Sequence, residues 1–232
     1  MTTGFSYPTE YFLGEGQSNL QRCLEVSFEA AVTHNIGRIV IFTGAGKGIR
    51  LAIDNFLSQE RYSSIDVVAV SFPHGSKFTD STLEHGISEE TATYIRAKGV
   101  PIVKAHLPFE PIKAHHDSHG ILGQDLTLIG NALSIFCGSM SLCVQAALMA
   151  CDAGEIELGE HVISMTSDTS VLVRASGTRD LLTDFVVREI LCKPVLLTIV
   201  KSEVPTSSDE NEEQLEEVAP LALQDGIDNQ DS

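Results

Sequence analysis

Short, nearly continuous apolar runs recur along the first 200 residues of the chain. The five clearest are rich in Val and Ile and cover residues 38–43, 65–72, 100–107, 161–166 and 195–200. Apolar and polar positions do not alternate within them, as they would in a strand with one face in water. This composition is typical of strands buried on both faces, as in parallel sheets. The pattern therefore predicts a mostly parallel sheet of about five strands.

Helical periodicity fills the intervals between these runs. Apolar residues recur every three or four positions over residues 18–35, 48–60, 88–98, 125–153 and 178–192. Ser18 and Ser88 stand where N-caps are expected. The fourth segment is long enough for two helices, with a break near Gly138 and Ser139. Strands that alternate with helices predict a doubly wound α/β fold, and residues 1–201 are expected to form a single domain.

The fold class itself predicts where a ligand would bind. In open α/β sheets, ligands bind beyond the carboxyl ends of the strands. In this sequence those ends fall at residues 43–44, 71–74, 106–107 and 166–168. This edge of the sheet is the expected site, whatever motif it carries.

Charge is distributed unevenly along the chain. Of the net charge of −17, residues 202–232 contribute ten acidic residues and no basic one, which leaves −7 for residues 1–201. The segment 202–232 has no aromatic residue, so it is predicted to be a disordered acidic tail. Nucleic acids and anionic membranes attract basic surfaces, and neither is an expected partner.

Cysteine usage indicates a reducing compartment. The chain has five cysteines, an odd number, and no Cys-x-x-Cys pair. Reduced thiols in a cytoplasmic protein are expected rather than a disulfide framework or a zinc site. No secretory signal is visible at the N-terminus. The most apolar stretch, 126–151, is interrupted by Gly, Asn and Gln and is predicted to be a buried helix rather than a membrane span.

The sequence FTGAGKGIR, residues 42–50, follows the first predicted strand. A phosphate-binding P-loop needs a glycine at position 41 and Ser or Thr at position 48, where this chain has Ile41 and Gly48. A dinucleotide loop needs a third glycine where Ile49 stands. Both fingerprints are absent. A phosphate or another anion at the start of the following helix and a purely structural turn remain the two alternatives.

Histidines and possible nucleophiles give a weaker signal. His115, His116 and His119 lie close together in a segment rich in Pro and Gly, with no second cluster, so a solvated loop is favoured over a metal site and none is predicted. His74 and His106 lie at strand ends and could act as general acids or bases, or simply as loop residues. No Gly-x-Ser-x-Gly elbow is present. The sequence therefore identifies no catalytic residue.

Five segments together resemble a known family. They are YFLGEGQSNL (11–20), RIVIFTGAGKG (38–48), VVAVSFPHG (67–75), GVPIVKAHLPF (99–109) and AALMACDAG (146–154). In order and spacing they resemble small stand-alone proteins similar to the C-terminal α/β domain of pyruvate kinase. The resemblance implies a doubly wound domain without the catalytic barrel, and hence no pyruvate kinase activity. In the full enzyme this domain binds a sugar-phosphate regulator and supports tetramer contacts.

The resemblance also implies a ligand and its position. Some members are associated with flavin mononucleotide (FMN) near the strand ends. Carried onto this chain, the cofactor-binding residues would be Thr43, Gly44, Gly46, Lys47, Gly48, His74, Gly75, His106, Thr166, Ser167 and Asp168. Three hypotheses follow. The protein binds a phosphorylated small molecule and can form a homo-oligomer, or it is a non-catalytic scaffold or regulatory subunit whose acidic tail contacts partners. The third hypothesis is an enzyme whose reaction the sequence does not identify.

Overall fold

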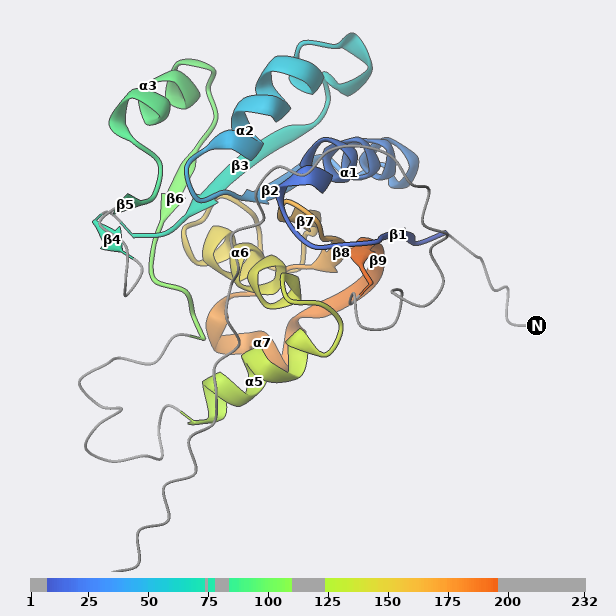
Figure 1. Cartoon of the computed structure of the whole chain (residues 1–232), viewed down its shortest axis with the longest axis vertical. Helices are drawn as coiled ribbons and strands as arrows, with labels where there is room; N and C mark the ends of the chain where they lie inside the picture. The colour runs from blue at the N-terminus through green and yellow to red at the C-terminus, as the bar shows by residue number, and fades with distance from the viewer. Residues whose placement is uncertain (1–7, 74, 78–83, 110–123, 196–232) are drawn as a thin grey trace, which may run out of the picture. The chain divides into compact units, whose positions relative to one another are not determined.

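One seven-stranded sheet organises the molecule (Figure 1). It is seen in a computed structural model that describes residues 8–73, 75–77, 84–109 and 124–195. The strand order is β1-β9-β8-β7-β2-β3-β6. The strands are β1 (Glu10–Phe12), β2 (Arg38–Phe42), β3 (Asp66–Ser71), β6 (Ile102–Lys104), β7 (His161–Met165), β8 (Ser170–Arg174) and β9 (Val186–Pro194). A separate two-stranded hairpin pairs β4 (Ser76–Lys77) with β5 (Glu84–His85).

The predicted fold class is confirmed. Strands β7, β2, β3 and β6 pair in parallel, as do β1 and β9, and within the described sheet β8 alone runs antiparallel to its neighbours. The sheet has more strands than the five expected. Because β1, β2, β3, β6, β7 and β9 share one direction, their carboxyl ends meet at one edge of the sheet.

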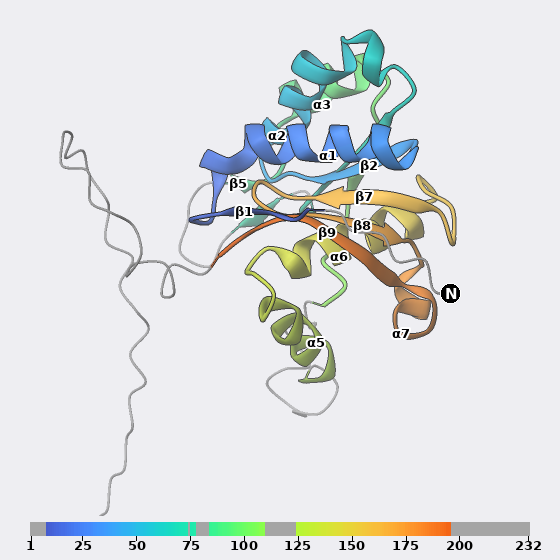
Figure 2. The same ribbon diagram turned by 90° about the vertical axis from the view of Figure 1, so that its right-hand side faces the viewer.

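Helices cover both faces of the sheet (Figure 2). The face of α1 (Leu20–His34), α2 (Lys47–Ala52) and α3 (Glu89–Ala97) is packed around Phe28, Ile39 and Ile41. The other face carries α5 (Gln124–Ser134) and α6 (Met140–Asp152), with Val40, Phe42 and Cys143 in its core. Alternate residues of β2 thus enter opposite cores, which explains why its sequence is continuously apolar.

The long apolar segment 125–153 divides as expected. Helix α5 ends at Ser134 and α6 begins at Met140, so the break lies around Gly138 and Ser139. Helix α3 also begins as predicted, because the Ser88 side chain accepts a hydrogen bond from the Thr91 N–H. The helix expected over 48–60 is α2, followed by a π-helical turn over Ile53–Leu57 and a 3₁₀ turn over Glu60–Tyr62.

The prediction of a helix over residues 178–192 is wrong. Only a 3₁₀ turn over Thr178–Asp180 and the short α7 (Leu181–Asp184) form there, and β9 follows. Apolar residues in this segment fit a helical period as well as a strand. Pairing decides the outcome, because β9 lies between β8 and β1 and satisfies the backbone hydrogen bonds of both.

Two further expectations about local structure are also corrected. Strand β8 was not predicted, and it follows β7 through a tight turn in which the Thr166 N–H donates to the Thr169 carbonyl over 2.8 Å. Ser18 lies in a 3₁₀ turn, Gln17–Asn19, and Asn19 precedes the first residue of α1 without a side-chain cap. The strand predicted over 195–200, apart from Val195, and the tail 202–232 lie outside the described residues.

Candidate functional site

The turn after β2 is a tight strand-to-helix connection at the carboxyl edge of the sheet. The Thr43 N–H donates to the Val70 carbonyl over 2.8 Å, which extends the pairing of β2 with β3 by one residue. Gly46 has a left-handed backbone, with φ of 92°, and α2 begins at Lys47. A left-handed residue at this point strongly favours glycine.

Packing explains one of the glycines in the turn. A Cβ on Gly46 would lie 2.6 Å from Cγ2 of Thr91 in α3, which is too close for any side chain. A Cβ on Gly48 would lie 3.5 Å from Cδ1 of Leu20, the first residue of α1. Gly44 has no described atom within 4 Å of its Cβ position. The distance at Gly48 is an ordinary van der Waals contact, so among these three glycines close packing requires glycine only at position 46.

Lys47 gives this turn a local positive charge. The side chain is exposed and has no hydrogen-bond or ion-pair partner among the described residues. Helix α2 has neither a side-chain cap nor an acidic residue in its first turn. Helix α3, in contrast, begins with the Ser88 cap followed by Glu89 and Glu90. A lysine at a helix N-terminus is electrostatically unfavourable unless an anion lies beside it.

Ser71, which the sequence placed at a strand end but not among the site residues, fixes the position of this turn. It is the last residue of β3, it is fully buried, and its hydroxyl donates to the Gly44 carbonyl over 3.0 Å. The signal that could have identified it is a polar residue that ends an otherwise apolar strand at the edge where ligands bind. Thr43 is also buried, at 6% exposure, so its hydroxyl is only partly accessible.

Asp168 lies in the turn from β7 to β8 and is almost completely buried, at 2% exposure. One carboxylate oxygen, Oδ2, accepts from the Gly16 N–H over 2.7 Å. The other, Oδ1, accepts from the hydroxyls of Thr166 at 3.3 Å and Thr169 at 3.1 Å. Both oxygens are therefore engaged within the protein. Of the three expected residues in this turn, only Ser167 is not buried.

His106 lies on a different part of the surface. It follows β6, its side chain is exposed, and it lines an open groove of about 540 Å³. Lys104 of β6 and Asp152 near the end of α6 line the same groove. No residue of the turns 43–48 or 166–168 does so. The turns after β2, β3 and β7 thus lie at one edge of the sheet, whereas His106 lines a groove to which the turns 43–48 and 166–168 contribute no residue.

Of the remaining expected residues, the structure describes only Gly75, which directly precedes the hairpin β4–β5. Gly75 is exposed and has a left-handed backbone, with φ of 73°. His74 lies outside the described residues, as do His115, His116 and His119. In the part of the chain that the structure describes, no group of three His, Cys, Asp or Glu side chains is placed to hold a metal ion.

The cysteines lack the environment of nucleophiles. All five are free and buried. Burial raises the pKa of the Cys23 thiol, and hydrogen bonding to Cys192, whose Sγ lies 3.4 Å away, adds to this. Burial likewise raises the pKa of Cys143 and, against the opposing hydrogen bond from Thr169, that of Cys137. A protonated, inaccessible thiol is a poor nucleophile.

Comparison with known proteins gives a limited result. No protein-family model matches the sequence. Among solved structures, the chain is similar to pyruvate kinase from Cryptosporidium parvum, with 16% identity over 70% of this chain, 24% of that chain and a TM-score of 0.33. The same enzyme in complex with ADP matches at 15% identity over 71% of this chain and 25% of that chain, with a TM-score of 0.32.

The chain therefore spans about a quarter of the length of the pyruvate kinases that it matches. At this TM-score the similarity says nothing about a ligand or an activity. Separately, none of the helices in the described ranges has the length and apolar character needed to span a bilayer.

Proposed function

We propose that this protein binds a phosphate-bearing small molecule at the carboxyl ends of β2, β3 and β7, with FMN as the specific candidate. One observation carries the proposal: Lys47 is an exposed cation without a partner among the described residues, placed at the start of α2 where no acid or cap offsets it. A phosphate beside Lys47 would remove this unfavourable arrangement, since helix N-terminal N–H groups and an ammonium both attract anions.

The surroundings of Lys47 suit a ligand of moderate size. Gly44 has open space where a side chain would be, so a ligand can approach the backbone there. Ser167, in the neighbouring β7–β8 turn, is partly exposed and offers a hydroxyl. Thr43, Thr166 and Asp168 are buried, so in this proposal they hold the turns in place rather than contact the ligand. Because residues 1–201 carry a net charge of −7, the site depends on this local positive charge rather than on the global field.

Fluorescence titration tests the proposal. For the wild type, the quenching of FMN fluorescence should saturate as protein is added. Lys47→Ala should raise the dissociation constant for FMN at least about tenfold, equivalent to about 1.4 kcal/mol. Lys98→Ala is the matched control, because Lys98 is an exposed lysine at the opposite, amino edge of the sheet. Riboflavin, which lacks the phosphate, should bind more weakly than FMN. Absence of saturable quenching would reject FMN, and equal binding of riboflavin would reject the phosphate as the recognised group.

A scaffold or regulatory role is the second candidate. This role is favoured because polar groups at the strand ends already have hydrogen-bond partners within the protein. Both oxygens of Asp168 accept such bonds, and the hydroxyl of Ser71 donates one. A scaffold would keep its cellular function after Lys47→Ala and lose it on deletion of residues 202–232. The ligand-binding protein would show the reverse, so a complementation assay with the two variants separates the roles.

Self-association belongs to the same proposal. Three apolar side chains in or just after α5 are well exposed: Leu128 within the helix at 66%, and Ile135 at 79% and Phe136 at 50% directly after it. Phe136 also lines a hollow of about 300 Å³ together with Val187 of β9. Exposed apolar groups of this kind are common at protein interfaces. Light scattering after gel filtration should give a mass above the 25.1 kDa of the single chain, and a monomer for Ile135→Asp.

A further inference from the structure

Cys23 of α1 and Cys192 of β9 are in direct contact, although 169 residues separate them in the sequence. Their Sγ atoms lie 3.4 Å apart, and neither residue is exposed to solvent. Both belong to the core on the α1 face of the sheet, whereas Cys137, Cys143 and Cys151 belong to the core on the other face. A disulfide needs an S–S distance of about 2.05 Å, so a small approach of the two sulfur atoms of Cys23 and Cys192 is sufficient.

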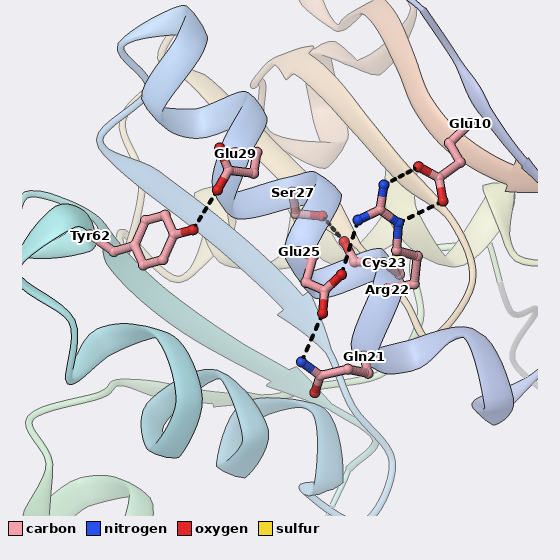
Figure 3. A network of polar contacts seen from close by, with 8 residues as sticks. All are labelled: Glu10, Gln21, Arg22, Cys23, Glu25, Ser27, Glu29 and Tyr62. Atoms are coloured by element: carbon pink, nitrogen blue, oxygen red, sulfur yellow. Dashed lines mark hydrogen bonds and ion pairs between the residues drawn. The ribbon is translucent and has the colours of Figure 1, made fainter.

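An ion pair holds α1 against the strand on one side of Cys192. That strand is β1, in which Glu10 is the residue paired with Cys192. Arg22, next to Cys23 in α1, binds the Glu10 carboxylate through two hydrogen bonds of 2.8 and 2.7 Å (Figure 3). Paired bonds of this kind fix the orientation of the two groups. The helix therefore holds Cys23 at a defined position relative to the β1–β9 pair.

A buried hydroxyl pair does the same on the other side of Cys192. There β8 places Ser170 opposite Cys192. Ser27, one turn after Cys23 in α1, is hydrogen-bonded to the Ser170 hydroxyl over 2.7 Å, and both serines are fully buried. The Ser27 hydroxyl also lies 2.7 Å from the Cys23 carbonyl, its second partner (Figure 3). Because α1 is held on both sides of Cys192, the contact between the two sulfur atoms is a property of the packed fold.

We propose that Cys23 and Cys192 are a redox pair, which a hydroperoxide oxidises to a disulfide that joins α1 to β9. The reduced pair is the resting form. Oxidation adds a covalent link between helix α1 and the edge of the sheet that β9 and β1 form. The proposal does not depend on the proposed ligand site, because neither cysteine belongs to the turns 43–48 or 166–168.

The oxidation has two steps. One sulfur of the pair attacks an oxygen of the hydroperoxide, so that an S–O bond forms, the O–O bond breaks, and the other oxygen leaves with the thiol proton. The second sulfur then attacks the sulfenic sulfur, so that the S–S bond forms and the S–O bond breaks. The hydroxyl leaves with the second thiol proton as water. In total the two thiols lose two electrons and two protons, and one molecule of hydrogen peroxide is reduced to two molecules of water.

Burial controls the rate of this reaction rather than its product. Burial raises the pKa of the Cys23 thiol, and its hydrogen bond with Cys192 adds to this, so little thiolate is present at neutral pH. Peroxide reaches the pair through local opening of the structure, which makes the first step slow. The second step is fast, because a neighbouring group held in contact reacts as if at very high concentration. We therefore expect a slow reaction with a specific product.

Peptide mapping after peroxide treatment tests the pair. The full-length protein is incubated with hydrogen peroxide in urea below the unfolding transition, which increases local opening, and free thiols are then alkylated without reduction. The peptides that contain Cys23 and Cys192 should be cross-linked and two hydrogens lighter than their sum. Cys151→Ser is the matched control, because Cys151 is also buried with a raised pKa but belongs to the other core, and it should cross-link like the wild type. Cys192→Ala should give no cross-link to Cys23.

A thermal melt measures the effect of the cross-link. A disulfide that closes a long loop stabilises the folded state unless its geometry is strained. The oxidised wild type should melt about 5 °C or more above the reduced form, and dithiothreitol should reverse the shift. Cys192→Ala, treated with peroxide in the same way, should show no upward shift. If Cys192→Ala does not fold, Cys23→Ala takes its place, and the mapping of the wild type is decisive in either case.

The other outcomes overturn the proposal or a defined part of it. If Cys23 and Cys192 are still alkylated as free thiols after treatment, the redox pair is rejected. Sulfinic acid on Cys23 without a cross-link also rejects it, as do cross-links scattered among the five cysteines. A specific cross-link with an unchanged or lower melting temperature rejects the stabilising link between α1 and β9. No FMN is present in these experiments, so their result leaves the proposed ligand site to its own test.

Discussion

The carboxylate of Asp168 accepts a hydrogen bond from the backbone N–H of Gly16 over 2.7 Å, across 152 residues of sequence. This contact joins the β7–β8 turn to the connection that precedes α1. Asp168 is buried, and its described donors are one N–H and two hydroxyls, all neutral. The carboxylate is thus a structural brace at the edge where the ligand is proposed to bind.

Asp168→Asn tests this brace. An amide has one acceptor oxygen instead of two, so the three hydrogen bonds that the carboxylate accepts must be lost or rearranged, at a cost of about 1–3 kcal/mol in the free energy of unfolding. Urea denaturation measures the change. Ser167→Ala, next to it but partly exposed, should cost less than about 0.5 kcal/mol. Equal stability of Asp168→Asn and the wild type would contradict the assignment of a brace.

Gly46→Ala should destabilise the protein for two reasons. The left-handed backbone costs a non-glycine residue about 1 kcal/mol or more, and the new Cβ would meet Cγ2 of Thr91 at 2.6 Å. A total loss of about 2–4 kcal/mol is expected from chemical denaturation. Gly44→Ala, in open space in the same turn, is the matched control and should be nearly neutral.

A second variant separates the two causes. Thr91→Ser removes Cγ2 but keeps the hydroxyl that bonds with Ser88. In a double-mutant cycle, Gly46→Ala should therefore cost less in the Thr91→Ser background, by an amount of about 1 kcal/mol. If the effects of the two substitutions on the free energy of unfolding simply add, the contact with Thr91 is not a reason why position 46 requires glycine.

Glu10 makes the stability of the protein depend on acid pH. Its hydrogen bonds to Arg22 lower the pKa of the carboxyl from its ordinary value of 4.5, with burial opposing. A lowered folded-state pKa means that the stabilisation is present above pH 4.5 and is lost as the pH falls through the folded-state pKa. The pair is partly exposed, so its contribution is at most about 1 kcal/mol.

Melting curves of Glu10→Gln between pH 7 and pH 3 check this sign. The variant should be slightly less stable than the wild type at pH 7, and the difference should shrink toward pH 3. Glu25→Gln is a useful comparison, since Glu25 contacts Arg22 from within the same helix. A gap that widens as the pH falls would contradict the stated direction.

The five thiols should be unreactive in the folded protein. Burial raises the pKa of Cys23 and Cys143, so little thiolate is present at neutral pH. With an aromatic disulfide reagent at pH 8, native labelling should be slow and should follow unfolding, and all five cysteines should react in denaturant. Rapid native modification of Cys23 or Cys143 would show that these positions are accessible after all.

The parallel core of the sheet could be predicted from the sequence, because strands such as β2 and β3 are buried on both faces and must be continuously apolar. The same pattern placed Thr43 and Thr166 at one edge. Ser88 and the break near Gly138 also followed from local rules, since caps and glycines act within a few residues.

Tertiary structure alone decided the rest. Residues 186–194 have a pattern that fits a helix or a strand, and the open positions beside β8 and β1 select the strand. Glycine is required at position 46 because Thr91, 45 residues away in the sequence, leaves no room for a Cβ. Asp168 is likewise held by a hydrogen bond from the distant Gly16. Local periodicity determines which faces are apolar, but it carries no information on which distant segments meet at a turn. For that reason the sequence by itself determined the fold class and the edge at which the strand ends meet, whereas long-range packing decided which residues at that edge are buried and which, like Lys47, are exposed.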